Sequence, residues 1–206
     1  MPRVRVHQHV NPLAPFYRFT PQPIRIETVF ADPQQPLHLD IGCARGRFIL
    51  KMAELFHERN FLGAEIREPL VAEANRLARE GGLTNLHYEF NNATYSLDRL
   101  LEDLPADVLH TVTIQFPDPW YKKKHAKRRM VNDGLVETIV GHLTVGGKVY
   151  VQTDVEFLAE EMFEIFRGNE RLREIETSEN PFPVKTERET AVEEKGLPLY
   201  RRMFIK

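Results

Sequence analysis

The stretch Leu37-His-Leu-Asp-Ile-Gly-Cys-Ala-Arg-Gly46 decides which fold we expect for this chain of 206 residues. Its first five residues form a short, mainly apolar run, which is typical of a buried strand. Gly42 and Gly46 follow, and an amphipathic helical pattern begins directly after them. Because glycine allows a sharp turn and a close approach of backbone to ligand, the stretch predicts a strand, a binding loop and a helix in succession.

Strand-like and helix-like segments alternate from this unit to the end of the chain. Such alternation predicts an α/β fold, with a mainly parallel sheet and helices on both faces. Ligands of these sheets bind beyond the carboxyl ends of the strands, where the strand order reverses. Asn132 and Asp154 are candidate caps of the helices on either side of the fifth strand. The expected strands span residues 37–41, 61–66, 86–90, 108–116, 148–153, 171–177 and 199–206.

Composition places the chain among single-domain proteins with a sizeable core. Hydrophobic residues make up 42% and charged residues 28%, and the formal net charge is −2. The one cysteine, Cys43, cannot form an internal disulfide, and no apolar run has the length of a signal peptide or a membrane span. We therefore expect a cytoplasmic protein without a membrane segment. No carboxylate or cysteine accompanies His7 and His9, so we expect no metal site.

Residues 1–36 are rich in proline and arginine and show little periodicity. They predict an irregular amino-terminal arm, followed by a single domain over residues 37–206. Basic side chains near the start of the arm suit a segment that orders on a nucleic acid, and a frayed terminus is an equally open alternative. These side chains are Arg3, Arg5, His7 and His9.

The loop after the first strand favours S-adenosylmethionine over a dinucleotide. A dinucleotide fingerprint requires glycine at positions 42, 44 and 47, and this chain has Ala44 and Arg47 instead. An acidic residue followed by Gly-x-x-x-Gly suits a cofactor that has a cationic amino acid end and no pyrophosphate. We expect Asp40 to lie near the ammonium group of this cofactor, with Gly42 and Gly46 shaping the turn.

Two further strand ends carry side chains suited to an adenosine. Glu65 ends the second strand, where a carboxylate can accept both ribose hydroxyls. Asn92 follows the third strand, where an amide or a backbone group can read the adenine edge. Taken singly, the glycines can be explained by a tight turn, and Glu65 by a charge at the start of a helix. Together, at three successive strand ends, they favour a cofactor site, and Cys43 is interpreted as a small filler because nothing nearby activates it.

The loop after the fourth strand, Phe116-Pro-Asp-Pro-Trp120, combines an acid with a restricted backbone. Its two prolines limit the conformation on either side of Asp118. Such a loop beside the cofactor suits a planar base held against a methyl group, with Trp120 and Tyr121 stacking on the base or walling the pocket. The arrangement is similar to the proline-rich loop of enzymes that methylate exocyclic amines of nucleobases.

A basic run follows this loop directly. Six of the eight residues from Lys122 to Arg129 are lysine or arginine. Most charge runs are solvated surface, and that interpretation remains open. The position of this run beside the expected pocket favours contacts with the phosphates of a nucleic acid.

The sequence resembles the bacterial tRNA (guanine-N7-)-methyltransferase family over nearly the whole chain. The motif Phe-Pro-Asp-Pro-Trp followed by a basic run is quite specific. The resemblance departs at Ala44, where a glycine is usual, and at Asn92, where an aspartate is common. The resembling segments are Val10-Asn-Pro-Leu13, Asp40-Ile-Gly-x-x-x-Gly46, Phe61-Leu-Gly-x-Glu65, Phe116-Pro-Asp-Pro-Trp120, Lys127-Arg-Arg129, Thr153-Asp154 and Thr190-x-x-Glu193-x-x-Gly196.

The resemblance implies a Rossmann-like class I methyltransferase with a seven-stranded sheet and an antiparallel last strand. It implies S-adenosylmethionine as cofactor and N7 of a guanine in tRNA as target, with the variable-loop guanine expected. A monomer and a homodimer are both compatible with the sequence. The residues it assigns are Asp40, Glu65, Asn92 and Asp118 for the cofactor, Lys122, Asp154, Thr190 and Glu193 for the substrate, and Lys124, Lys127, Arg128 and Arg129 for tRNA.

The chemistry of guanine N7 sets what the protein must supply. N7 carries a lone pair and no proton, so it attacks a methyl carbon without a general base. Positive charge moves from the sulfonium to the base, and catalysis rests on in-line positioning and on carboxylates near the developing charge. We expect Asp118 to be the catalytic carboxylate, with Asp154 in a similar role from the next strand end.

Two other functions remain open from the residues alone. One is a methyltransferase that acts on a nucleobase amine or a small molecule, and the basic run disfavours the small molecule. The other is a tRNA-binding protein with an inactive cofactor pocket. The intact set of acidic residues and glycines at the strand ends disfavours the second alternative.

Overall fold

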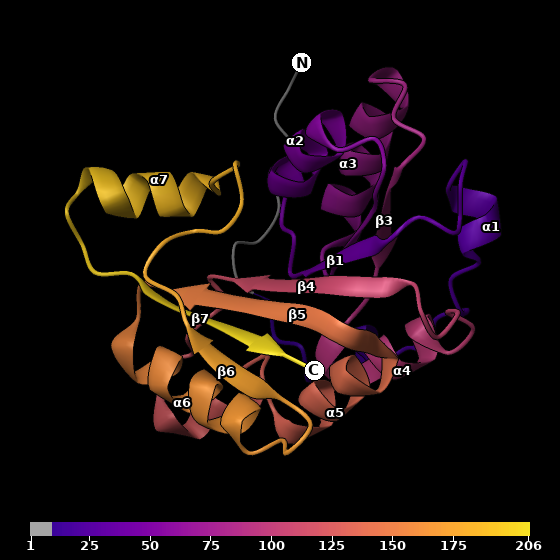
Figure 1. Ribbon diagram of the computed structural model, residues 1–206. Helices are drawn as coiled ribbons and strands as arrows, with labels where there is room; N and C mark the ends of the chain where they lie inside the picture. The colour runs from indigo at the N-terminus through magenta and orange to yellow at the C-terminus, as the bar shows by residue number, and fades with distance from the viewer. Residues whose placement is uncertain (1–9) are drawn as a thin grey trace.

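The computed structural model describes residues 10–206, which form one seven-stranded sheet (Figure 1). The strand order is β3-β2-β1-β4-β5-β7-β6. Neighbouring strands from β3 to β5 are parallel, and β7 runs antiparallel to both β5 and β6. This confirms the expected sheet with its antiparallel last strand. The strands are β1 (Leu37–Ile41), β2 (Asn60–Glu65), β3 (Leu86–Phe90), β4 (Leu109–Gln115), β5 (Leu143–Thr153), β6 (Arg173–Glu176) and β7 (Tyr200–Ile205).

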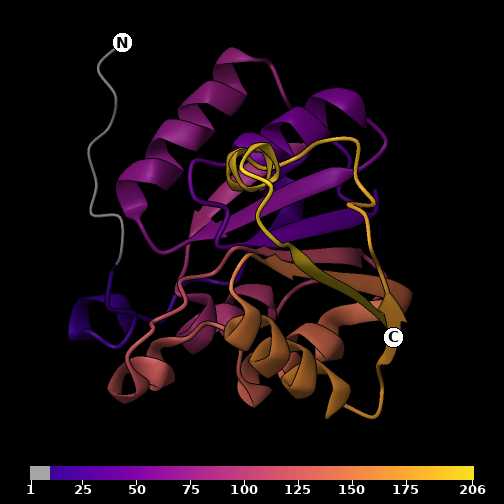
Figure 2. The ribbon, with the colours of Figure 1, turned by 90° about the vertical axis from the view of Figure 1, so that its left-hand side faces the viewer.

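Helices cover both faces of the sheet, as Figures 1 and 2 show. α2 and α3 lie on one face, and α7 lies on the same side near the end of the sheet formed by β5, β7 and β6. α4, α5 and α6 cover the other face. The helices are α1 (Ile26–Val29), α2 (Arg47–Leu55), α3 (Glu68–Glu80), α4 (Ala93–Leu101), α5 (Asp133–His142), α6 (Glu156–Arg167) and α7 (Glu187–Glu194), with 3₁₀ turns η1 (Pro15–Tyr17) and η2 (Lys123–Arg128).

The order of the strands places a ligand cavity between β1 and β4. From β1 the chain continues outward through β2 to β3, then returns to the other side of β1 with β4. The connections after β1 and β4 therefore leave in opposite directions, which opens a crevice at their carboxyl ends. All five residues of β1 are buried, as expected for a central strand with a helical layer on each side.

The described part of the expected arm packs on the domain. Ile24, Ile26 and Phe30 belong to the same buried cluster as the apolar side chains of β1, β4 and α4 to α6. The backbone N–H of Ile24 donates to the carbonyl of Leu100 in α4 over 2.9 Å. The four basic side chains expected at the start of the arm lie outside the described residues.

Three local features test the expected helices. Asn132 caps α5, with its side-chain oxygen accepting from the N–H of Leu135 over 3.0 Å, which confirms that prediction. The predicted cap at Asp154 is wrong, because Val155 occupies the cap position of α6 and makes no side-chain capping bond. The predicted elements did not include α4 and α7. α4 buries Leu97, Leu100 and Leu101 at helical spacing, a signal that the sequence analysis passed over. α7 buries only Glu189 and Val192 and gives no clear periodic signal.

Candidate active site

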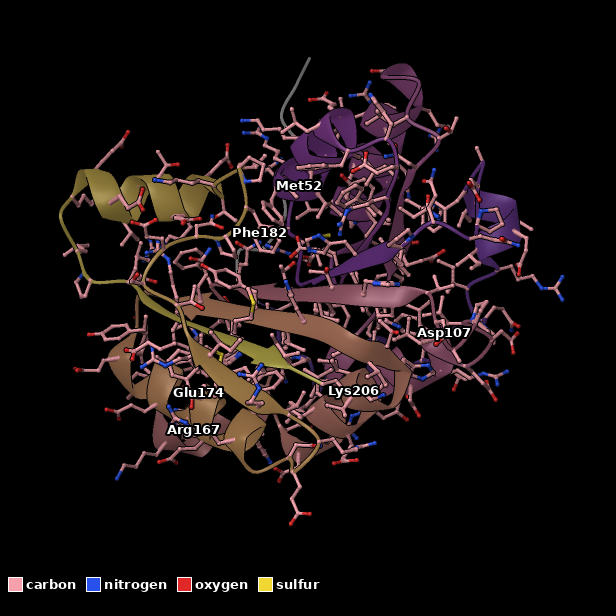
Figure 3. All side chains as sticks on the ribbon, viewed as in Figure 1. Met52, Asp107, Arg167, Glu174, Phe182 and Lys206 are labelled. Atoms are coloured by element: carbon pink, nitrogen blue, oxygen red, sulfur yellow. The ribbon has the colours of Figure 1, made fainter. Side chains whose placement is uncertain are left out.

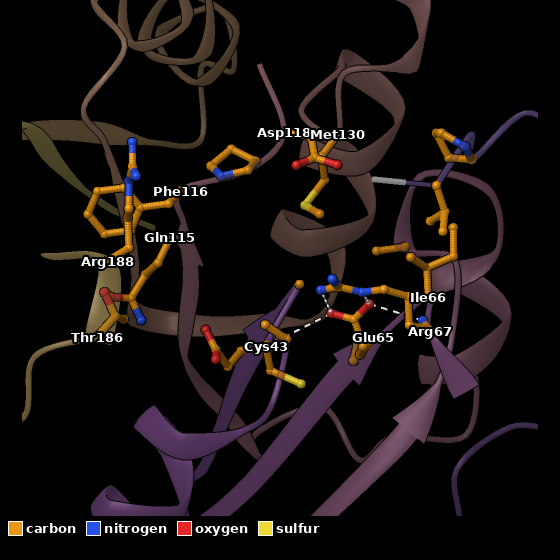
Figure 4. A pocket seen from close by; sticks show the side chains of 18 of the residues that line it. Cys43, Glu65, Ile66, Arg67, Gln115, Phe116, Asp118, Met130, Thr186 and Arg188 are labelled. Carbon is orange, nitrogen blue, oxygen red and sulfur yellow. Dashed lines mark hydrogen bonds and ion pairs between the residues drawn. The ribbon is translucent and has the colours of Figure 1, made fainter. Parts of the chain in front are cut away.

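A cavity of about 880 Å³ lies at the carboxyl ends of β1, β2, β3, β4 and β5 (Figure 4). Segments from five strand ends and from the start of α7 line it. The structure thus brings together most of the residues that the sequence selected for cofactor and substrate. Those that line the cavity are Asp40, Gly42, Glu65, Asn92, Asp118, Arg128 and Asp154.

The loop after β1 takes its shape from three residues with positive φ. Gly42 has φ 77°, Ala44 has φ 53° and Gly46 has φ 69°. Ala44 therefore keeps the left-handed backbone that a glycine would adopt without strain. A Cβ atom at Gly46 would lie 2.2 Å from the ring of Tyr88, whose hydroxyl donates to the Gly46 carbonyl over 2.7 Å. Gly46 thus shapes the turn from below and does not line the cavity.

Glu65 is a buried carboxylate that joins two sides of the cavity. Its Oε2 accepts from the backbone N–H of Ala44 over 2.8 Å, and its Oε1 accepts from Nε of Arg67 over 2.7 Å. Figure 4 shows this pair at the end of β2, with Asp118 and Met130 on the opposite side of the cavity. Because the glycine loop and the guanidinium both hold Glu65, its two oxygens stay at the cavity wall.

The carboxyl group of Asp40 lies in a largely desolvated environment at the cavity wall. Its residue is 4% exposed, and Oδ1 accepts from the hydroxyl of Thr113 over 2.6 Å. The pKa of Asp40 is raised to about 6, chiefly by burial. The Thr113 hydroxyl and the Gln115 amide act to lower this pKa, and the nearby Glu65 carboxylate acts to raise it. Such a carboxylate gains the most from a cationic partner, because water does little to stabilise its charge.

Asn92 connects the cavity to the amino-terminal segment. Its Nδ2 donates to the carbonyl of Pro12 over 2.8 Å and to the carbonyl of Tyr17 over 3.0 Å. Phe19 continues this attachment by stacking on Phe90 of β3, with ring centroids 4.6 Å apart. The amide nitrogen of Asn92 therefore holds residues 12–19 beside the pocket.

The Phe-Pro-Asp-Pro-Trp loop has a strained backbone and is held in place by the side chain of Arg129. Phe116 and Trp120 both have positive φ, 52° and 42°, which is uncommon for large side chains and occurs where the surroundings impose it. Arg129 Nε donates to the carbonyl of Pro119 over 3.0 Å, and the same guanidinium pairs with Glu161 of α6. The loop is thereby held rigidly, with Asp118 at the cavity wall.

The basic run divides into two groups by exposure. Lys122, Lys124 and Lys127 are exposed and do not line the cavity. Arg128 lies over the ring of Trp120, 4.9 Å from its centroid. The Arg129 side chain is 10% exposed and is engaged by the loop and by α6. Lys124 and Lys127 thus present their charges to solvent, and Arg129 holds the loop.

The start of α7 contributes a wall of the cavity that the sequence analysis missed. Thr186, Glu187 and Arg188 line it, and Figure 4 shows Thr186 and Arg188 near Gln115 and Phe116. Arg188 forms an ion pair with Asp154 at the end of β5. Asp154 therefore binds an arginine that lies 34 residues later in the chain and does not cap α6.

Thr190 and Glu193 lie one helical turn beyond this wall and do not line the cavity. The Thr190 hydroxyl donates to the carbonyl of Thr186 over 3.2 Å, and Glu193 accepts from Arg201 over 3.1 Å. The same Thr-x-x-Glu spacing occurs at Thr186 and Glu189, and this repeated spacing is the signal that could have found Thr186. Their roles as substrate contacts stay predictions.

Glu189 anchors α7 from within the protein. It is fully buried, and its Oε1 accepts from Arg201 of β7 over 2.9 Å. Its Oε2 accepts from Gln152 of β5 over 3.1 Å. A buried carboxylate needs such charged and polar partners, so this network fixes where the first turn of α7 meets the cavity.

Comparisons with known proteins agree with this geometry. A family model described as a putative methyltransferase matches residues 34–202. A tRNA (guanine-N(7)-)-methyltransferase of Trichormus variabilis is 53% identical and covers 99% of this chain and 97% of its own length. One of Synechococcus elongatus is 51% identical and covers 100% of this chain and 98% of its own length.

The chain belongs to the tRNA (guanine-N7-)-methyltransferase family. This confirms the resemblance that the motifs indicated. Two solved structures show the same fold at low identity. The YcgJ protein of Bacillus subtilis has a TM-score of 0.56 at 14% identity, covering 88% of this chain and 95% of its own. An rRNA methylase of Streptococcus thermophilus has a TM-score of 0.54 at 11% identity, covering 88% of this chain and 91% of its own.

No helix within residues 10–206 has the length and apolar character needed to cross a membrane. No group of three or more histidine, cysteine, aspartate and glutamate side chains in the same range is arranged to hold a metal ion.

Proposed function

We propose that this chain transfers the methyl group of S-adenosylmethionine to N7 of a guanine in the variable loop of tRNA, in the cytoplasm. One observation carries the proposal. Asp118, in its strained and clamped loop, lines the same cavity as Asp40 and Glu65. Asp118, expected to contact the guanine, and the two carboxylates expected to contact the cofactor thus line one cavity of about 880 Å³.

The residues at the strand ends fit the donor. When bound, S-adenosylmethionine supplies a sulfonium methyl group. Asp40, a desolvated carboxylate, suits the α-ammonium group at its amino acid end. Glu65 suits the ribose hydroxyls, which donate to the same oxygens that Arg67 contacts in this structure. Asn92, beside the start of α4, suits the adenine edge.

Asp118 and Asp154 suit the guanine. A carboxylate accepts hydrogen bonds from the Watson–Crick edge, which orients the ring and directs N7 at the methyl group. A carboxylate close to the base also offsets the positive charge that the product gains. The clamp by Arg129 keeps the loop that bears Asp118 fixed, so little reorganisation accompanies the reaction.

Exposed lysines beside the loop suit the tRNA backbone. Lys122, Lys124 and Lys127 lie on the same segment as Arg128, which reaches the cavity wall. Phosphate contacts position a nucleic acid without reading its sequence. This arrangement brings an RNA backbone to the mouth of the pocket that takes one base.

The test is incubation of unmodified tRNA with methyl-labelled S-adenosylmethionine, followed by nucleoside analysis. We expect 7-methylguanosine, and we expect it to vanish from tRNA whose variable-loop guanine is replaced. Label on exocyclic amines of the bases would instead support a methyltransferase that acts on a nucleobase amine. Binding of tRNA without any transfer, together with no calorimetric binding of the donor, would support the inactive binding protein.

Asp118→Asn tests the assigned chemistry. We expect the turnover number to fall at least 100-fold, as when a charge-stabilising group is removed from an active site. The melting temperature should stay close to that of the unmodified chain. A variant with near-normal turnover would show that Asp118 is not the catalytic carboxylate.

A further inference from the structure

A hydrogen-bond chain continues from Asp40 away from the cavity. The Thr113 hydroxyl lies 2.6 Å from Asp40 Oδ1, and His38 Nε2 lies 3.1 Å from the same hydroxyl oxygen. His38 and Asp40 are two residues apart on β1, so their side chains share one face. Thr113 stands opposite Asp40 in the register of β1 and β4. His38 and Thr113 are buried and do not line the cavity.

The ionised state of Asp40 decides which group donates. A carboxylate has no proton to give, so Thr113 donates to Asp40 Oδ1 over 2.6 Å. The hydroxyl has one proton, and its oxygen must therefore accept from His38. This requires the His38 tautomer that carries its proton on Nε2. Burial, with a smaller effect of Arg59, lowers the pKa of His38 to about 3, so the ring is neutral.

Aromatic rings hold the imidazole in this orientation. Phe48, Phe61 and Phe182 surround it, with ring centroids 5.9, 5.5 and 5.4 Å away. Phe182 comes from the segment before α7, and Figure 3 shows it reaching from there toward the sheet. These rings give the imidazole apolar neighbours, and the Thr113 hydroxyl is the polar group that its Nε2 contacts.

We propose that His38 is a positioning residue for the methyl donor: its Nε2–H aims the Thr113 hydroxyl at Asp40 and thereby keeps Asp40 an acceptor for the α-ammonium group. The inference rests on the proposed function, because it takes Asp40 as the ammonium contact. His38 itself touches neither the donor nor the base.

Other groups also face Asp40 and enter its titration. Glu65 from β2 opposes its ionisation, and Gln115 from β4 favours it. Gln152 Nε2 donates to Gln115 Oε1 over 2.7 Å, so this bond fixes the orientation of the Gln115 amide. Cys43 of the glycine loop is a buried thiol whose pKa burial raises, so it stays neutral. Asp40 thus has one bonded donor, the Thr113 hydroxyl, with the Gln115 amide and the opposing Glu65 charge nearby.

The proposal predicts a pH-dependent defect in donor binding. Hydrogen bonds in a chain polarise one another, so loss of the His38 donor weakens the bond from Thr113 to Asp40. Asp40 then takes up a proton at higher pH, and a protonated carboxyl no longer attracts the ammonium group. We expect binding to weaken about three- to tenfold at pH 6 and by less than about twofold at pH 7.5. The donor's α-amino group stays mainly protonated up to that pH.

The experiment is calorimetric titration of the full chain with S-adenosylmethionine between pH 5.5 and 7.5. His38→Leu removes the donor, His38→Gln restores an amide N–H at a similar position, and Thr113→Val removes the hydroxyl with little change of shape. We expect the leucine and valine variants to show the defect and the glutamine variant to recover most of the affinity. His87→Leu, at a half-exposed histidine paired with Glu89 on β3, is the matched control and should bind normally.

A double variant separates positioning from general damage. If His38 acts through Thr113, His38→Leu should add no further loss in the Thr113→Val background. An additional loss of similar size, or an equal loss at all pH values, would overturn the inference. Should the leucine variant fail to fold, Thr113→Val and His38→Gln carry the same pH comparison. Unchanged binding by Asp40→Asn would instead refute the cofactor site, which distinguishes failure of the proposed function.

Discussion

The backbone N–H of Ala44 donates to Oε2 of Glu65 over 2.8 Å, and this bond joins the loop after β1 to the end of β2. The bond requires the left-handed backbone of Ala44, which turns its N–H toward the neighbouring strand end. The departure from glycine at this position thus leaves the turn unchanged. Its effect is strain, because a Cβ in the left-handed region costs about 1–2 kcal/mol.

Replacing Ala44 should therefore change stability in opposite directions. Ala44→Gly removes the strain, and the greater freedom of glycine in the unfolded chain offsets about 0.4–1 kcal/mol of the gain. We expect the free energy of unfolding to rise by about 0.5–1 kcal/mol. Ala44→Val should lower it, because a β-branched side chain tolerates positive φ poorly. Urea denaturation measures both, and a destabilised Ala44→Gly variant would contradict this account. Ala53→Gly in the buried face of α2 is the control and should lose at least about 1 kcal/mol.

The two halves of the basic run should respond differently to salt. Lys124 and Lys127 are exposed, so replacing both with alanine should flatten the salt dependence of tRNA binding by about two counterions. Turnover at saturating tRNA should change little. Arg129→Ala should instead lower turnover, because the clamp on Pro119 is lost. Binding measured from low to high salt and single-turnover rates test this. Equal salt slopes for the lysine variant and the unmodified chain would show that these lysines meet no phosphate.

The side of the cavity formed by the ends of β1 and β2 could be predicted from the sequence, and the α7 side could not. Asp40 and Glu65 end strands that the apolar pattern reveals, and parallel strands bring their carboxyl ends to one edge. The position of Thr186 depends instead on tertiary contacts. Glu189 is buried against Arg201 of β7, and a buried charge in a short, polar helix leaves no periodic pattern to read. The pairing of Asp154 with Arg188 depends on the same placement of α7.

Thr186 and Thr190 can be separated by matched variants. The Thr186 hydroxyl caps α7 by accepting from the N–H of Glu189 over 3.1 Å, and the residue lines the cavity. Thr186→Ala should cost about 1 kcal/mol of stability and weaken substrate binding, while Thr186→Ser should preserve both. Thr190→Ala, one turn further from the cavity, should preserve the Michaelis constant for tRNA. Steady-state kinetics decide the point, and a defect confined to Thr190→Ala would restore the assignment predicted from the sequence.

Burial of the Asp40 charge should lower the free energy of unfolding at neutral pH. Its pKa in the folded chain is about 6, above the ordinary value of 3.8. A carboxyl with a raised pKa stabilises the fold fully below 3.8, and this contribution is lost as the pH rises through about 6. At pH 7.5 the buried charge then costs up to about 3 kcal/mol relative to the protonated form.

Asp40→Asn removes that charge while its amide oxygen can still accept from Thr113. We expect the unfolding free energy of the variant to exceed that of the unmodified chain by about 1–3 kcal/mol at pH 7.5 and to match it near pH 4. Donor binding should be lost at both pH values, since an amide does not neutralise an ammonium group. Chemical denaturation across this pH range checks the sign. Greater stability of the unmodified chain at pH 7.5 would mean that Asp40 is paired in the free protein and does not await a cation.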